Sequence, residues 1–177
     1  MSSQTHAMGW ILPFTAKAQE ADWEVLYKEE LPRIFNFFRY RVGDVSLAED
    51  LTSTTFEKAW QHRDRYRRDL AGFSTWLFTI ARNVAADHFR RHNVQVPLEA
   101  IHDVPSASNP EASAVKQAEF QRLSVLLATL PERERELLAL KYGAGLTNRS
   151  IAQITGLSES NVGSLLHRTI HSLRESW

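Results

Sequence analysis

Two pairs of histidines have the spacing of a metal or catalytic site. His88 and His92, like His167 and His171, are four residues apart, and each pair therefore shares one face if its segment is helical. Zinc enzymes combine such pairs with a third ligand and a glutamate base, and neither pair has them nearby. Nearby arginines would also repel a cation. The chain has no cysteine. We therefore expect no metal, no cofactor and no enzymatic activity, and interpret the histidines as surface groups near phosphate.

Charge is the second chemical signal, and it is unevenly distributed. The 177 residues include 21 basic and 21 acidic ones, and a net charge of zero argues against nucleic-acid binding at first. Residues 20–57, however, hold nine acidic and four basic side chains, whereas residues 58–93 hold eight basic and three acidic ones. The first segment suits a basic protein surface, and the second suits phosphate.

The segment 147–174 has the spacing of a helix-turn-helix. Thr147 and Ser158 are of the types that cap helix N-termini, and Gly156 lies where the chain must turn sharply. Apolar residues at helical spacing form the expected inward set. They are Ile151, Ala152, Ile154, Leu157, Val162, Leu165 and Leu166.

The last predicted helix presents a polar face opposite its apolar stripe. Asparagine and arginine can make bidentate contacts with base edges in a major groove, and the other polar side chains can reach phosphates. The candidate contacts of this unit are Arg149, Ser158, Ser160, Asn161, Ser164, His167, Arg168 and His171. Residues 141–177 hold only four basic and two acidic side chains, so we expect this unit alone to bind DNA weakly.

Helical periodicity extends over almost the whole chain, and no segment alternates as a strand would. We predict an all-α fold of two small helical domains, the second a helix-turn-helix domain. The first domain, 20–93, is expected to contain helices at 22–42, 47–65 and 74–91. Pro32 is expected to kink the first helix, and a capping box of Ser46 and Glu49 to begin the second.

A linker rich in proline, serine and alanine is predicted at 94–113, between the first domain and a second domain at 114–177. Residues 1–19 are predicted to be an N-terminal extension without the features of a signal peptide. The longest apolar runs are far shorter than the roughly 20 residues that cross a bilayer. We therefore expect a cytoplasmic protein with no direct membrane insertion.

Residues 48–60 and 73–91 together resemble region 2 of extracytoplasmic-function sigma factors, which are bacterial transcription initiation factors. Residues 130–136 with the helix-turn-helix resemble region 4 of the same family. The resemblance covers about 22–177, in the family's order and with a linker between the two regions. It implies a protein that binds RNA polymerase core and directs initiation at promoters by recognising −10 and −35 elements and assisting DNA melting.

The resemblance also implies roles for individual residues. The second helix would dock on the clamp of the largest polymerase subunit through Glu49, Asp50, Leu51, Thr54, Phe56, Glu57 and Trp60. The third helix and the loop before it would bind the −10 element through Tyr66, Arg67, Arg68, Phe73, Arg82, Asn83, Asp87, Arg90 and Arg91. Arginines track phosphate, and an aromatic ring replaces the stacking that a base loses in an opened strand. Tyr66 is the expected exposed ring, and Trp76 and Phe89 are expected to be core residues.

The remaining partners follow from the same resemblance. The second domain would bind the −35 element and the flap of the second-largest subunit, and an anti-sigma factor is the expected regulator. Two positions depart from the family. Ser53 and Thr54 replace a glutamine and an acid, which removes a charge at the clamp, and Gly163 and Leu165 replace basic residues, which reduces phosphate contacts.

Two other interpretations remain open. A helix-turn-helix regulator of the response-regulator type shares the Glu-Arg-Glu run before the motif, although the first 93 residues lack the alternating strands of a receiver domain. A sigma-like protein that binds polymerase without recognising a promoter is suggested by Gly163 and Leu165.

Overall fold

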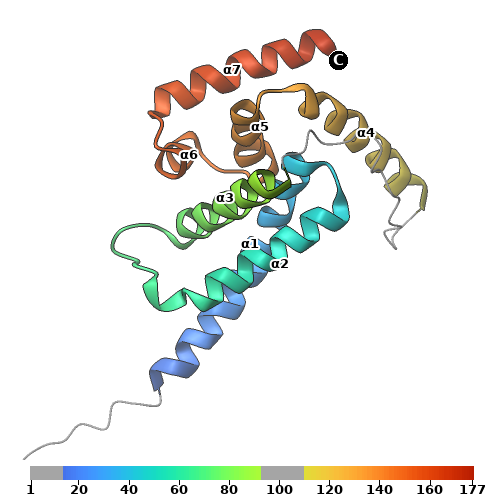
Figure 1. Ribbon diagram of the computed structural model, residues 1–177. Helices are drawn as coiled ribbons and strands as arrows, with labels where there is room; N and C mark the ends of the chain where they lie inside the picture. The colour runs from blue at the N-terminus through green and yellow to red at the C-terminus, as the bar shows by residue number, and fades with distance from the viewer. Residues whose placement is uncertain (1–13, 93–109) are drawn as a thin grey trace, which may run out of the picture.

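The chain forms helices joined by turns (Figure 1). The computed structural model describes the backbone of residues 14–92 and 110–177, and the side chains of 22–92 and 114–177. Within these ranges every regular element is helical, as the periodicity predicts. No helix in the described part of the chain is both long and apolar enough to cross a membrane.

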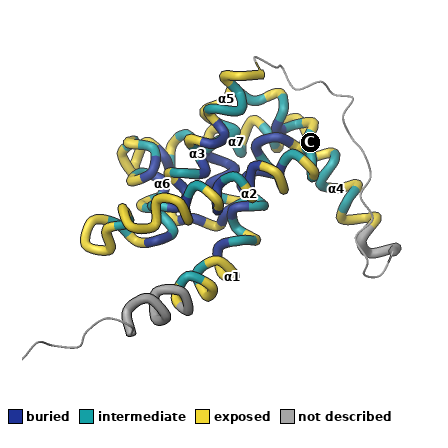
Figure 2. The backbone as a smooth tube through the Cα atoms, turned by 60° about the horizontal axis from the view of Figure 1, so that its bottom comes forward, coloured by how far each residue is buried: buried dark blue, intermediate teal, exposed yellow. Residues whose placement is uncertain are grey.

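The first unit consists of α1 (Phe14–Val42), α2 (Val45–Gln61) and α3 (Phe73–His92), with a short 3-10 turn at Arg63–Arg65. Phe37, Phe38 and Phe78 are fully buried where these helices meet. The buried segments gather in the centre of the molecule, with exposed residues on its outer faces (Figure 2).

The start of α2 differs from the prediction. Asp44 rather than Ser46 is the N-cap, because its carboxylate accepts the Leu47 N–H at 2.7 Å. The capping box of Ser46 and Glu49 was therefore wrong, and Ser46 lies inside the helix. Gly43, at φ 72°, follows directly after Val42, which is the predicted last residue of this helix, and ends α1 because the left-handed conformation suits glycine.

The second unit contains α4 (Pro110–Thr129), α5 (Glu132–Leu138), a π-helical turn at Ala139–Gly143, α6 (Asn148–Thr155) and α7 (Glu159–Ser176). The first four residues of α4 lie within the predicted linker, and the rest of the linker, 94–109, is outside the described residues. Likewise, α1 includes residues 14–19 of the predicted extension, and 1–13 are not described.

The two units share one continuous hydrophobic core. The π-helical turn lies so close to α1 that a Cβ on Gly143 would be 2.9 Å from the carbonyl oxygen of Asn36. Next to it, the Arg33 Nε donates to the Ala144 carbonyl at 3.0 Å. Further along α1, the Arg39 guanidinium lies 3.8 Å from the ring centre of Phe120 on α4. In this arrangement the second unit covers part of α1 and α3.

Candidate nucleic-acid interface

Helix α7 is fixed by two caps and one turn. The Thr147 and Ser158 hydroxyls each accept a backbone N–H at 3.1 Å, from Ser150 and Asn161 respectively. Between them Gly156 has φ 75°, so the chain turns where the sequence predicts. These three features set the angle at which α7 follows α6, as a helix-turn-helix requires.

The inward stripe of α7 is confirmed. Val162, Leu166 and Thr169 are buried, and the Thr169 hydroxyl is satisfied by the Leu165 carbonyl at 2.9 Å. All eight predicted contacts of this unit are exposed, which leaves them free to reach DNA. They are Arg149, Ser158, Ser160, Asn161, Ser164, His167, Arg168 and His171.

The loop between α2 and α3 carries the densest group of cations in the first unit. Arg67 donates to both oxygens of Asp69, at 2.9 and 2.7 Å, and this pair lowers the pKa of the Asp69 carboxyl and raises that of Arg67. Arg68 lies 3.6 Å from Asp22 on α1. Both arginines are well exposed, so these pairs are weak and phosphate can compete for them.

Aromatic rings line the base of this loop, and the structure buries more of them than predicted. Phe73 is 8% exposed and packs edge-on against Trp23 and Tyr66, so it is a core residue rather than a DNA contact in this arrangement. Tyr66 is half-buried rather than free, with its ring centre 5.1 Å from that of Trp76. Trp76 and Phe89 are half-buried against the core.

The C-terminal half of α3 presents both free and paired groups. Asn83, Arg90 and Arg91 are exposed, as a DNA surface requires. The Asp87 carboxylate accepts from Arg90 and lies 3.7 Å from the Lys58 ammonium. Asp87 is thus held by two cations, and reading a base edge would require it to exchange these partners.

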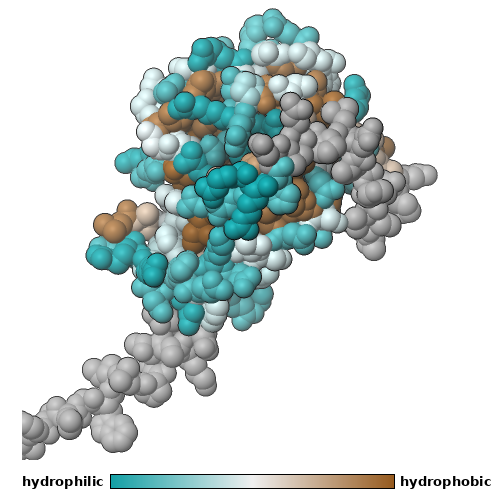
Figure 3. Space-filling model, viewed as in Figure 1, coloured by the Kyte–Doolittle hydropathy of each residue, from teal (hydrophilic) through white to brown (hydrophobic). Residues whose placement is uncertain are grey.

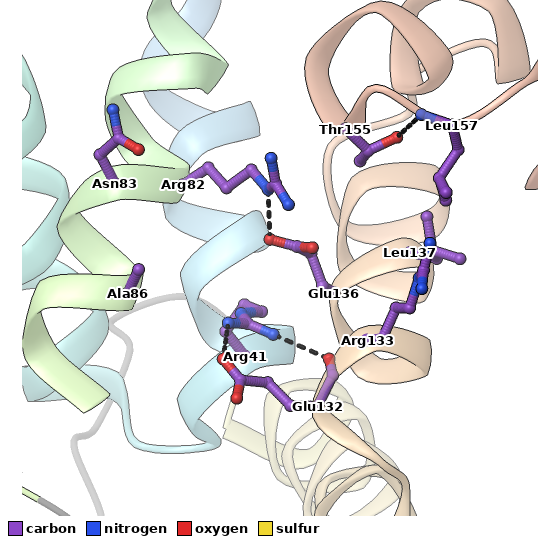
Figure 4. A pocket seen from close by; sticks show the side chains of 10 residues that line it. All are labelled: Arg41, Arg82, Asn83, Ala86, Glu132, Arg133, Glu136, Leu137, Thr155 and Leu157. Carbon is purple, nitrogen blue, oxygen red and sulfur yellow. Dashed lines mark hydrogen bonds and ion pairs between the residues drawn. The ribbon is translucent and has the colours of Figure 1, made fainter. Parts of the chain in front are cut away.

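Arg82 is bound to the second unit (Figure 4). Its Nε donates to the Glu136 carboxylate at 2.8 Å, and its Nη1 donates to the Ile154 carbonyl at 3.2 Å. A second arginine, Arg41, is 2% exposed and bridges the units in the same way, donating to the Glu132 carbonyl and carboxylate at 3.1 and 3.3 Å. Burial lowers the pKa of Arg41, and the nearby Glu136 and Glu132 oppose this shift.

These pairs border a cavity of about 580 Å³ between the two units. Three arginines and two glutamates are among its lining residues, and Figure 4 shows Arg41 and Arg82 projecting from α1 and α3 toward Glu132 and Glu136 on α5. Asn83 also lines it. One predicted −10 contact, Arg82, therefore faces the second unit in this arrangement, whereas Asn83 borders the cavity with its side chain still exposed.

Only some residues of the predicted docking face of α2 are exposed to solvent. Glu49, Asp50 and Glu57 are exposed, and Trp60 is 38% exposed. Thr54 is half-buried. Leu51 and Phe56, by contrast, are 7% and 6% exposed. These two assignments are corrected, because the helical period points both side chains at the core of the first unit.

The histidine pairs behave as surface groups. His88 and His92 stack with ring centres 4.3 Å apart, and burial together with the charge of His92 lowers the pKa of His88. His171 lies 3.5 Å from Glu175. No group of three or more possible ligands that could hold a metal ion occurs among the described side chains, those of residues 22–92 and 114–177.

Comparison with known proteins agrees with this geometry. Sigma-70 region 2 matches residues 26–94, and Sigma-70 region 4 matches residues 120–171. The ECF RNA polymerase sigma factor BldN of Streptomyces coelicolor is 31% identical over 162 residues, which are 89% of this chain and 61% of BldN. The ECF RNA polymerase sigma factor SigM of Bacillus subtilis is 30% identical over 150 residues, 84% of this chain and 91% of SigM.

Solved structures give the same result. The sigma factor RpoE from Bartonella quintana, in complex with the anti-sigma factor NepR, matches with a TM-score of 0.70 and 25% identity over 87% of this chain and 95% of RpoE. CnrH, in complex with the cytosolic domain of CnrY, shares the fold at a TM-score of 0.61 and 20% identity, covering 90% of each chain.

Two regions in this order are the arrangement of sigma-70-type initiation factors. The chain belongs to the ECF RNA polymerase sigma factors.

Sequence reasoning missed the groups that join the two units. Glu132 and Glu136 belong to the segment 130–136 that resembles region 4, and the sequence assigns them no partner, yet they hold Arg41 and Arg82. Nothing in the spacing of these four residues indicates the pairing, because it depends on how the second unit packs on the first.

Proposed function

We propose that this protein binds RNA polymerase core and directs it to promoters, with the first unit opening the −10 element and the second unit reading the −35 element. One observation supports this proposal most directly: each of the two matched regions has its own exposed polar surface. On the first unit this surface is the α2–α3 loop with the end of α3, and on the second unit it is the outer face of α7. The nucleotide chemistry then belongs to the polymerase, and this chain contributes binding. Such a protein acts in the cytoplasm.

The exposed acids of α2 are the proposed contact with the clamp of the largest subunit. Glu49, Asp50 and Glu57 form a negative face that suits a basic partner, and Trp60 adds apolar area beside it. The second unit is the proposed contact with the flap of the second-largest subunit.

An anti-sigma factor is the proposed regulator. The structure of the similar protein RpoE was solved in complex with an anti-sigma factor, and the match to RpoE covers most of this chain. In the present structure the Arg82–Glu136 and Arg41–Glu132 pairs already hold the units together, so a promoter complex that uses Arg82 requires α5 and α6 to move away from α3.

Association with core polymerase tests the proposal. The protein should co-elute with purified core polymerase of the source organism in size-exclusion chromatography. Asp50→Ala should weaken this binding roughly 10-fold, since it removes one charge from the contact. Glu119→Ala, which removes an exposed acid on α4, is the matched control and should bind as the wild type does. Failure of the wild-type protein to bind core would refute the proposal, and equal binding by Asp50→Ala would remove α2 from the docking role.

A further inference from the structure

The cavity between the two units has no role in the proposed function. Its volume of about 580 Å³ lies within the range of sites that take small organic ligands. Its lining residues belong to α1 and α3 of the first unit and to α5, α6 and the turn after α6 in the second. A ligand in the cavity would therefore contact both units at once.

The charged side chains of this cavity do not balance. Three arginines and two glutamates line it, which leaves an excess of one positive charge. Arg41 and Arg82 are paired with Glu132 and Glu136, whereas Arg133 is exposed and has no ion-pair partner among the described side chains. An anion is therefore the favoured ligand.

Arg41 is the most deeply buried of the three arginines. Its side chain is 2% exposed, while that of its partner Glu132 is 70% exposed and lies 3.3 Å away. The Nε of Arg41 is also buried and has no hydrogen-bond partner among the described residues. Because a buried charge is costly unless it is well paired, this wall of the cavity favours a further negative group.

Arg82 has donor capacity left as well. It donates through Nε to Glu136 and through Nη1 to the Ile154 carbonyl, and its Nη2 forms no hydrogen bond within the described part of the chain. The Arg82 side chain is 36% exposed, so a ligand can reach it. Guanidinium groups bind phosphate oxygens through paired, charge-assisted N–H donors, which makes phosphate the anion that fits three arginines best.

The same cavity offers apolar contacts. Ala86 is exposed and Leu157 is half-buried, and both line the cavity beside the charged groups. On the face drawn in Figure 3, hydrophilic atoms gather in the centre, where Figure 1 places the end of α3, and apolar patches lie around them. A ligand with a phosphate and an uncharged organic part matches this lining better than a bare ion.

We propose that the cavity binds a small organic phosphate. Arg41, Arg82 and Arg133 hold the phosphate, and Ala86 and Leu157 contact the uncharged part. Since the ligand contacts both units only when they are packed together, it stabilises this packing, which then depends on the concentration of the metabolite.

Isothermal titration calorimetry of the full-length protein tests the site, with AMP, inorganic phosphate and adenosine as probes. AMP should bind at one site per chain, inorganic phosphate more weakly, and adenosine not detectably. Arg133→Gln should weaken AMP binding about 10-fold, because it removes one charged donor, and Arg133→Lys should weaken it less. Arg174→Gln, which removes an exposed arginine of α7 outside the cavity, is the matched control and should bind AMP as the wild type does.

Hydrogen exchange locates the bound AMP, because the cations proposed to contact DNA also attract phosphate. AMP should slow amide exchange in the second half of α3 and in α5 and α6, and leave α7 and the α2–α3 loop unchanged.

Four results would each overturn the proposal: no binding of AMP at millimolar concentration, equal binding of AMP and adenosine, equal affinity of Arg133→Gln and the wild type, or slowed exchange confined to α7 or the α2–α3 loop. These measurements use neither polymerase nor promoter. Their failure therefore leaves the proposed function intact, and failure of the protein to bind core polymerase leaves this site intact.

Discussion

Replacement of Gly143 by alanine probes the packing of the second unit on α1. A Cβ there would lie 2.9 Å from the carbonyl oxygen of Asn36 and 3.2 Å from a ring carbon of Tyr40, whereas ordinary contacts begin at 3.4 Å. Because the nearest atom belongs to the backbone of α1, the turn and the helix must separate by about half an ångström. Overpacking of this kind costs about 1–3 kcal/mol. The helix preference of alanine over glycine offsets roughly 0.5–1 kcal/mol of this cost, so we expect a net loss of up to about 2.5 kcal/mol.

Gly72→Ala is the matched control. Its Cβ would meet nothing within 4 Å, and its backbone is not left-handed, so the change should be neutral or stabilise by up to about 1 kcal/mol. The assay is urea unfolding of both variants, followed by far-UV circular dichroism. Gly143→Ala should unfold at a lower urea concentration than Gly72→Ala and the wild type. Equal stability of the two variants would show that the π-helical turn does not pack against α1 in solution.

Three further outcomes are expected. Glu136→Gln should raise the affinity of the isolated protein for single-stranded −10 DNA by about fivefold, because it removes the charge that holds Arg82 against α5 and so makes separation of the units easier. An unchanged affinity in fluorescence anisotropy titrations would refute this. Arg90→Ala with Arg91→Ala should abolish run-off transcription but keep core binding, whereas loss of core binding would assign the end of α3 to docking. Burial raises the pKa of Glu30, an effect that its contacts with Arg33 and Ser74 oppose, so the folded protein holds this proton more tightly than the unfolded chain. Its contribution to stability is present at low pH and is lost as pH rises from 4.5 through the raised pKa. The urea stability of the wild type relative to Glu30→Gln should therefore fall as pH rises above about 4.5, and a constant difference would contradict this.

Local signals in the sequence predicted the helix-turn-helix closely. Thr147, Gly156 and Ser158 act where they were expected to act, because caps and left-handed turns depend on residue type and on immediate neighbours. The inward stripe of α7 follows from periodicity for the same reason. The end of α1 at Gly43 is another local feature that the sequence specifies.

Features that depend on packing were not predictable in this way. Asp44 and Ser46 are both residue types that can cap α2. Which of them is the N-cap depends on the path of the chain after Gly43, and in the structure it is Asp44. The burial of Phe73 and the pairing of Arg82 with Glu136 depend on neighbours distant in sequence. As a result, the outer face of α7 could be predicted from the sequence, whereas the partly covered surface of α3 could not.

Run-off transcription with purified core polymerase from the source organism tests the central claim most directly. With this protein added, transcripts from genomic DNA should start at a discrete set of sites, each preceded by the same pair of sequence elements, and Arg90→Ala with Arg91→Ala should remove them. Transcript starts that are identical with and without the protein would contradict the assignment of promoter recognition to these two helical units.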